Sequence, residues 1–201
     1  MSAKYPEPLM ELIDLLKTLP GVGKRSAERL AFSMLKWQSD KLEALGENLK
    51  TLKEKVTDCP ECGNLSCENK ICPICASASR DRRIICVVEE AAQICNIEES
   101  ALFKGLYHVL GGKLSPLDGK GADNLATGSL KRRIESSGAT EIILAFSSDV
   151  EGQATAAYVA EFIRGTNAKV TRLAQGLPAG SDISYADSAT IAVALNGRTS
   201  V

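Results

Sequence analysis

Apolar side chains in the N-terminal quarter of the chain recur at the spacing of amphipathic helices. Residues 8–19 and 25–35 place them three or four positions apart, and a third such pattern begins near Ser39 or Asp40, which would cap the helix. The LPGVGK stretch separates the first two patterns. Its Pro20 would end one helix, and its two glycines permit the positive φ angles of a tight reversal. These patterns predict a small helical module.

The pattern changes in the second half of the chain. RRIICVVEE (82–90) and EIILAFSS (141–148) are continuous β-branched or apolar runs, typical of strands buried on both faces of a parallel sheet. Helical patterns alternate with strand patterns, which predicts an α/β sheet with crossover helices. The helices are expected at 129–137, 153–164 and 186–195, and a further strand at 168–174.

Composition limits the classes of function. The 201 residues are 44% hydrophobic, enough to build one domain or two small ones. Lys and Arg number 24 against 25 acidic residues, so the net charge of −1 gives no general attraction to nucleic acid. Any binding to nucleic acid must therefore come from a local basic patch.

Export and membrane insertion are not expected. Glu11 and Asp14 interrupt the apolar residues near the N-terminus, unlike the uninterrupted segment of a signal peptide, and no run of about eighteen uncharged apolar residues occurs. The expected location is therefore cytoplasmic. Because the cytoplasm is reducing, seven cysteines with five of them clustered favour metal binding over disulfides.

Five of the seven cysteines lie in the stretch CPECGNLSCENKICPIC, residues 59–75. Its two C-x-x-C pairs can each present two thiolates from one turn, and together they complete a four-sulfur zinc site with bonds of roughly 2.3 Å. Such a closed site has no open position for a substrate, so the Zn²⁺, one per chain, would be structural. The alternative is a set of free or redox-active thiols. The predicted ligands are Cys59, Cys62, Cys72 and Cys75.

The remaining cysteines are expected to play no part in the metal site. Cys67 lies midway between the two pairs and is surplus to a four-ligand site, so it is predicted to be a free thiol in the loop. Cys86 and Cys95 lie in apolar surroundings and are interpreted as small buried hydrophobic residues.

The glycine-rich hairpin LPGVGKRSAERL is a candidate phosphate-binding element. It is not a nucleotide-binding P-loop, because Thr18 replaces the first glycine of that motif and an arginine follows the lysine. The free N–H groups at the start of the second helix would instead attract a phosphate oxygen of a nucleic-acid backbone, without sequence preference. The alternative is a plain helix hairpin with solvated basic residues. The candidate DNA contacts are Gly21, Gly23, Lys24, Arg25 and Arg29.

Acidic residues follow two of the predicted strands. Glu89 ends the first, and Asp149 and Glu151 follow the second, so the three carboxylates would meet at the carboxyl ends of a parallel sheet. Converging carboxylates indicate magnesium and phosphoryl chemistry. The alternative is that they are solvated loop acids or residues that favour a helix N-terminus.

Three other residues carry weaker signals. His108, the only histidine, lies among apolar residues and is interpreted as a hydrogen-bonded core or loop residue rather than a base. The glycine-rich stretch SPLDGKGADN is expected to be a surface loop. Lys113, near its start, and Lys120, within it, could each contact a phosphate.

Two of these motifs resemble known structural families. The P-G-V-G-x-x-x-A-x-x-L pattern resembles the helix-hairpin-helix motif of non-specific DNA-binding proteins. The acids resemble those of the Toprim fold of topoisomerases and primases, in which a glutamate follows one strand and an Asp-x-Asp-x-Glu-Gly run follows another. Ser147 stands where that run has its first aspartate. The resemblance therefore implies a Toprim domain that has lost part of its divalent-cation site.

The order of the motifs resembles the RecR family of bacterial recombination-repair proteins over nearly the whole chain. The resemblance implies an N-terminal helix-hairpin-helix DNA-binding module, a small four-cysteine zinc finger, and a Toprim (Rossmann-like) α/β domain with a C-terminal helix and assembly segment. The expected boundaries are 1–56, 57–79 and 80–201.

The resemblance also implies a function. It predicts a non-enzymatic recombination mediator that binds DNA and, with its partners RecO and RecF, helps to load RecA at single-stranded gaps. It implies a homo-oligomer, a ring of four copies that can surround DNA, in which Glu89, Asp149 and Glu151 contact partners rather than metal. The competing hypothesis is a magnesium-dependent Toprim nuclease or primase-like enzyme that uses the same three acids.

Overall fold

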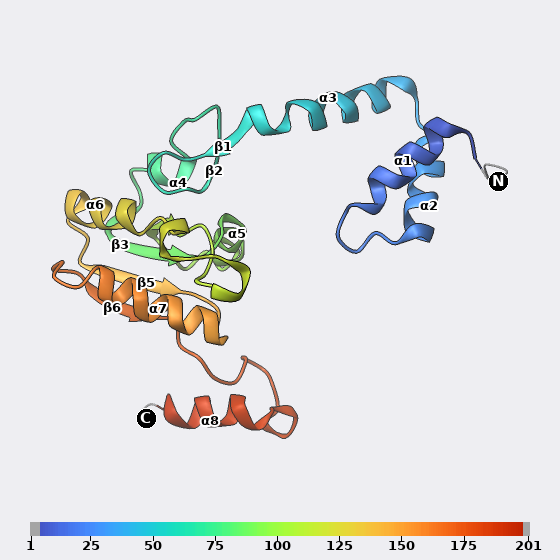
Figure 1. Cartoon of the computed structure of the whole chain (residues 1–201). Helices are drawn as coiled ribbons and strands as arrows, with labels where there is room; N and C mark the ends of the chain where they lie inside the picture. The colour runs from blue at the N-terminus through green and yellow to red at the C-terminus, as the bar shows by residue number, and fades with distance from the viewer. Residues whose placement is uncertain (1–4, 199–201) are drawn as a thin grey trace. The chain divides into compact units, whose positions relative to one another are not determined.

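The computed structural model describes residues 5–198. The chain divides into two compact units, residues 1–55 and 56–201 (Figure 1). Each unit is described by itself.

The first unit is helical. It consists of α1 (Glu7–Lys17), α2 (Lys24–Met34) and α3 (Ser39–Lys55). The hairpin of α1 and α2 turns at Gly21, whose φ of 76° is a conformation that glycine adopts without strain. The buried residues of the hairpin are Ile13, Ala27 and Ala31.

The second unit begins with a two-stranded antiparallel ribbon. Its strands β1 (Val56–Asp58) and β2 (Leu65–Cys67) flank one C-x-x-C pair, and the short helix α4 (Pro73–Ala76) carries the other. The four cysteines of these pairs form a buried cluster of their own, separate from the core of the sheet.

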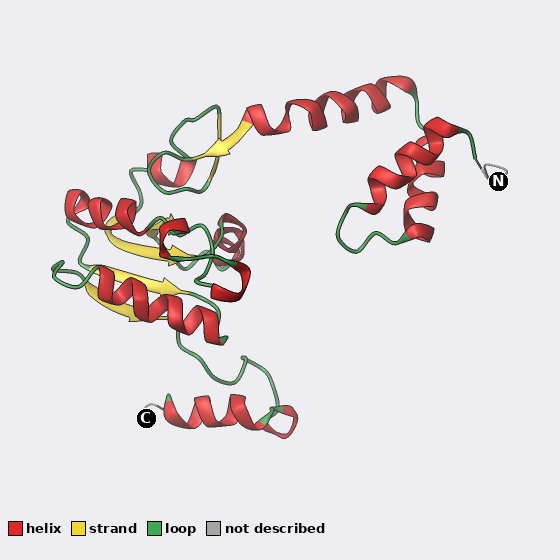
Figure 2. Ribbon diagram, in the orientation of Figure 1, coloured by secondary structure: helices red, strands yellow, loops and turns green. Residues whose placement is uncertain are grey.

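A four-stranded parallel sheet follows, with the strand order β4-β3-β5-β6 (Figure 2). Its central strand β3 alternates between the two faces: Ile85 and Val87 contact one core cluster, and Cys86 and Val88 contact the other. The strands are β3 (Asp81–Val88), β4 (Gly105–Val109), β5 (Glu141–Ala145) and β6 (Lys169–Arg172). The prediction of an α/β fold with a parallel sheet buried on both faces is confirmed.

Crossover helices cover both faces of the sheet. The helices α6 and α7 contribute buried side chains to the core on one face, and α5 contributes to the core on the other. The helices are α5 (Ala91–Glu99), α6 (Thr127–Ser137), α7 (Val150–Phe162) and α8 (Ser188–Asn196), with 3-10 turns at Pro116–Asp118, Ala122–Asn124 and Ile183–Tyr185. In the described part of the chain, no helix combines the length and apolarity that crossing a bilayer requires.

Three features differ from the sequence expectations. The pattern analysis gave no strand for β4, in which Tyr107 and His108 interrupt the apolar run, and no helix for α5, whose buried face is narrow. Cys95 is exposed, so the interpretation of this residue as a buried hydrophobe is wrong: the neighbouring Ile94 faces the sheet, and Cys95 faces solvent. Cys86 is buried as expected.

His108 is enclosed in the sheet and fits the structural role expected of it. The side chain is 2% exposed, its Nε2 lies 3.1 Å from the carbonyl oxygen of Ala126, and its Nδ1 has no hydrogen-bond partner among the described residues. Burial lowers the pKa of His108 to about 4, because the charged imidazolium loses its hydration.

We predict that His108 stays neutral down to about pH 4. The unfolded chain binds this proton near pH 6.5, so the free energy of unfolding should fall by at most about 3 kcal/mol as the pH falls from about 6.5 to about 4. The measurements are the imidazole titration by NMR, unambiguous for a single histidine, and urea unfolding across this range. His108→Gln should remove this component of the pH dependence; an identical dependence in wild type and variant would contradict the prediction.

Candidate metal centre and nucleic-acid interface

The structure brings the two C-x-x-C pairs together. The Sγ atoms of the four cysteines all lie within 4.8 Å of one another, and each residue is buried. The Cys62 and Cys72 sulfurs are 3.6 Å apart, close to the roughly 3.8 Å edge of a sulfur tetrahedron around zinc. Among the described residues, this is the only group of three or more potential ligands that is close enough to hold a metal ion.

Local backbone geometry places each pair. Cys59 and Cys62 lie in a turn after β1, in which the carbonyl of Cys59 accepts hydrogen bonds from the N–H groups of Cys62 and Gly63. The φ of Gly63 is 73°, and an added Cβ would lie 3.1 Å from Val109, so glycine is needed here on both counts. Cys72 caps α4, and Cys75 lies inside that helix.

Each of the four sulfur atoms accepts a hydrogen bond. Backbone N–H groups of Cys72, Asn64 and Cys75 donate to the sulfurs of Cys59, Cys62 and Cys72, at 3.3, 3.4 and 3.5 Å. The Arg133 guanidinium donates to Cys75 at 3.2 Å. Donors around a sulfur favour its thiolate form, which is the form that binds metal. A hydrogen bond from Cys62 and the charge of Arg133 lower the pKa of Cys75 to about 6. The hydrogen bond with Cys75 and burial raise the pKa of Cys62, and burial raises that of Cys72, so a bound cation would be needed to hold these two as thiolates. The donor set therefore fits a closed four-thiolate zinc site.

Hydrogen bonds hold the cysteine loop, residues 59–75, against β4, the edge strand of the sheet. Arg133, on α6, donates to the carbonyl oxygens of Glu61 at 3.2 Å and of Tyr107 at 2.6 Å, in addition to its bond to the sulfur. The N–H of Val109 donates to the carbonyl of Cys62 at 2.7 Å. One guanidinium thus joins the loop, β4 and α6.

The hairpin residues lie on an open surface. Lys24, Arg25 and Arg29 are exposed, and none of them has a carboxylate partner among the described residues. Gly23 caps α2 without a side chain, and the N–H of Ala27 makes the first intrahelical bond, to the Gly23 carbonyl. The preceding N–H groups of the first turn therefore have no acceptor in the described chain.

The acids Glu89, Asp149 and Glu151 lie at the carboxyl ends of β3 and β5, where Glu89 and Glu151 line one small cavity. In the described chain, the three are not close enough together to count as a group of metal ligands. Glu89 is buried, and its carboxylate accepts hydrogen bonds from the Ser147 N–H (2.7 Å), the Ser147 hydroxyl (3.0 Å) and the Gln93 amide (3.2 Å). Asp149 caps α7 by accepting a hydrogen bond from the Gly152 N–H at 2.7 Å.

Lys113 lies between the other two acids. Its ammonium group is 2.6 Å from the Asp149 carboxylate and 3.8 Å from that of Glu151. The hydrogen bond from Lys113, followed by that from the Gly152 backbone, lowers the pKa of Asp149 below its usual value. The ammonium group thus supplies a positive charge beside these two carboxylates.

Sequence reasoning missed Arg133 and Gln93, and it interpreted Lys113 as a possible phosphate contact rather than as the partner of two acids. The run of three basic residues that ends in Arg133 is a visible signal, but nothing in the sequence connects it to Cys75. Lys113 and Asp149 are too far apart in the chain for local spacing to pair them.

Only glycine fits at position 152, at the start of α7, because the backbone of Ser147 lies too close for a side chain. An added Cβ would lie 2.2 Å from the carbonyl oxygen of Ser147, so we predict that Gly152→Ala destabilises the protein by about 2–3 kcal/mol. Gly128 on α6 has nothing within 4 Å of its Cβ position, so Gly128→Ala should stabilise by roughly 0.5–1 kcal/mol. Urea unfolding measures both changes; equal effects would contradict the close contact at Gly152.

Comparisons with known proteins give a consistent result. Family models match a Toprim domain at residues 83–174, the RecR helix-hairpin-helix at 9–53 and the RecR C-terminal segment at 176–199.

Curated relatives named "Recombination protein RecR" align over almost the whole chain. The one from Bifidobacterium longum subsp. infantis is 43% identical over 98% of this chain and 98% of its own. That from Staphylococcus aureus is 43% identical over 97% and 98%, and that from Desulforapulum autotrophicum is 46% identical over 96% and 97%. With these identities over nearly the full length of both chains, the protein belongs to the RecR family.

Proposed function

We propose that this chain is a DNA-binding recombination mediator without catalytic activity, which acts with RecO and RecF to help load RecA at single-stranded gaps. The observation that carries the proposal is the basic surface at the start of α2. It combines three exposed cationic side chains with helix N–H groups of the first turn, none of which has a partner within residues 5–198, and both features attract phosphate.

The hairpin supports binding to the nucleic-acid backbone rather than to bases. Backbone N–H groups and arginine side chains on a helix tip position a phosphate but read no base edge. Between Lys17 and Lys36 the sequence has five basic residues and one acidic residue, so the local charge is positive although the whole chain is not. The proposed contacts are Gly21, Gly23, Lys24, Arg25 and Arg29.

The surroundings of the Toprim acids support a role other than catalysis. The Glu89 carboxylate accepts three hydrogen bonds within the protein, and Lys113 forms ion pairs with Asp149 and Glu151. Ser147 leaves no second aspartate beside Asp149 for a magnesium ion. The three acids are proposed as partner-binding residues. Magnesium-dependent cleavage or synthesis of DNA that is lost in Glu89→Ala would favour the enzyme hypothesis instead.

Exposed apolar side chains in both units support a homo-oligomer, for which we propose a tetrameric ring. In the first unit, Leu15 and Leu35 are 68% and 62% exposed, and α3 has no buried residue. In the C-terminal segment, Tyr185 is 90% exposed and Leu195 is 60% exposed. Several weak hairpins facing one lumen would also raise the avidity for DNA without further contacts.

We predict that Arg25→Glu combined with Arg29→Glu abolishes DNA binding at 150 mM salt, a loss of roughly 100-fold or more, because two phosphate contacts become repulsive in every copy. The measurement is fluorescence anisotropy with a labelled oligonucleotide. Lys50→Glu with Lys53→Glu, the same charge change on α3 of the same unit, is the matched control and should bind nearly as wild type does. Unchanged affinity in the hairpin variant would refute the assignment.

The cysteine cluster is proposed to bind one structural Zn²⁺ per chain. The segment has few apolar side chains, and zinc binding of about 10–16 kcal/mol in comparable peptides would supply the free energy that orders it.

We predict that Cys62→Ser or Cys72→Ser removes the zinc and lowers the melting temperature by roughly 10 °C or more. Cys67→Ser, which alters an exposed thiol in the same loop, should change neither quantity. Elemental analysis and calorimetry measure the two effects. Protein purified without chelator or oxidant that contains no zinc would contradict the assignment.

A further inference from the structure

The helix α6 carries a stripe of hydrogen-bonding side chains on one face. Its members are spaced at i, i+3, i+4, i+7 and i+8, so they lie on one side of the helix. Leu130 and Ile134 point instead into the core of the sheet. The stripe, which we call the α6 stripe, consists of Ser129, Arg132, Arg133, Ser136 and Ser137.

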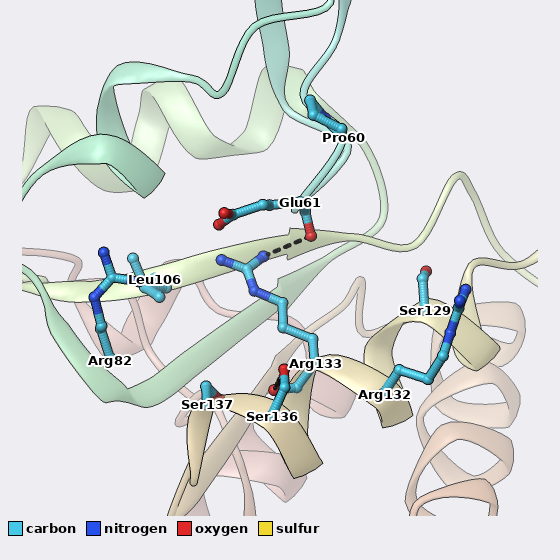
Figure 3. Close-up of a pocket in the computed structure, with 9 residues that line it drawn as sticks. All are labelled: Pro60, Glu61, Arg82, Leu106, Ser129, Arg132, Arg133, Ser136 and Ser137. Atoms are coloured by element: carbon cyan, nitrogen blue, oxygen red, sulfur yellow. Dashed lines mark hydrogen bonds between the residues drawn. The ribbon is translucent and has the colours of Figure 1, made fainter.

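The α6 stripe lines a cavity of about 470 Å³ (Figure 3). The other walls come from Pro60 and Glu61 in the cysteine loop, Arg82 on β3 and Leu106 on β4. Figure 3 shows Arg82 and Arg132 on either side of Arg133.

The charge of the cavity is positive and unbalanced. Three arginines face one carboxylate, that of Glu61, and none of the three is within ion-pair distance of a carboxylate in the described chain. Arg133 uses three of its five N–H donors on two carbonyls and a sulfur.

Arg82 and Arg132 keep most of their donors free. Arg82 makes one long bond, 3.3 Å to the Cys75 carbonyl, and Arg132 makes one of 3.4 Å to the Gly128 carbonyl. A guanidinium carries five N–H donors, so both can form paired hydrogen bonds to an oxyanion. Ser137 adds a buried hydroxyl without a hydrogen-bond partner among the described residues.

We infer that this cavity is a second nucleic-acid contact, which holds the sugar-phosphate backbone of DNA through Arg82 and Arg132. The inference rests on the proposed function in that the chain binds DNA, and it adds a site in residues 56–201 to the hairpin site in residues 1–55.

The chemistry of the lining selects the backbone of a nucleic acid over other polyanions. None of the lining residues is aromatic, so the cavity lacks the side chains on which bases most often stack, and the expected contact is with the backbone and independent of sequence. The apolar lining is limited to Pro60 and Leu106, which offers little to the apolar anchors that usually accompany acidic residues in a peptide motif. Two guanidinium groups with free donors, those of Arg82 and Arg132, instead suit the phosphates that repeat along a nucleic-acid backbone.

The test compares the full-length protein with the variant Arg82→Glu/Arg132→Glu. Arg133 is left unchanged because it holds the cysteine loop. The probe is a 5′-labelled thirty-nucleotide oligo(dT) strand, with a mixed-sequence strand of equal length alongside. The variant should bind both strands about tenfold more weakly at 50 mM salt, and the slope of log affinity against log salt should fall by about 1.4, the value for two phosphate contacts on single-stranded DNA.

The matched control is Arg83→Glu/Arg164→Glu, the same charge change at two exposed arginines of the same unit that pair with Asp81 and Glu161. Zinc content and melting temperature confirm that each variant is folded. Wild-type affinity and salt slope in Arg82→Glu/Arg132→Glu would overturn the inference, as would an equal loss in the control.

Two further results separate this inference from the proposed function and from a peptide site. If Arg25→Glu/Arg29→Glu binds DNA normally while Arg82→Glu/Arg132→Glu does not, the hairpin assignment fails and the cavity assignment stands. If an octaglutamate peptide binds wild type and not Arg82→Glu/Arg132→Glu, and DNA affinity is equal in the two proteins, the cavity is a peptide site and the inference fails.

Discussion

The segment between β1 and α4 has too few apolar side chains to form a core. Its order depends instead on four cysteine sulfur atoms that lie within 4.8 Å of one another. The surrounding N–H groups prepare these sulfurs for a cation. Through Arg133 and the carbonyl of Cys62, the same loop covers the edge strand β4, whose N–H and C=O groups would otherwise be open to pairing with another chain. The cysteine loop therefore also protects the edge of the sheet.

Acidic residues at the carboxyl end of the sheet are bound by other groups of the protein. Glu89 accepts hydrogen bonds from Ser147, and Asp149 accepts them from a backbone N–H and from Lys113. These contacts stabilise the turn between β5 and α7. A surface in which positive and negative charges alternate at fixed positions is well suited to recognising a protein partner.

Much of the fold could be read from the sequence, because long periodic runs determine element type. Strand β3, strand β5 and the two helices of the hairpin follow from their apolar patterns, and the cysteine cluster follows from its spacing. Strand β4 could not be read, since its Tyr107 and His108 are polar types that become acceptable only when neighbouring elements enclose them. The exposure of Cys95 and the contact of Arg133 with Cys75 depend on how helices rotate against the sheet, which spacing along one helix does not determine.

The N-terminal hairpin buries only one isoleucine and two alanines completely, and the larger side chains Leu9, Leu12, Leu16 and Val22 pack against them while part of their surface stays exposed. Partial burial of these side chains contributes less free energy than full burial would. In a homo-oligomer of the kind proposed, contacts between copies would bury more of this surface, and by mass action the stability of the unit would rise with protein concentration. The order of the hairpin would then vary with the amount of protein present.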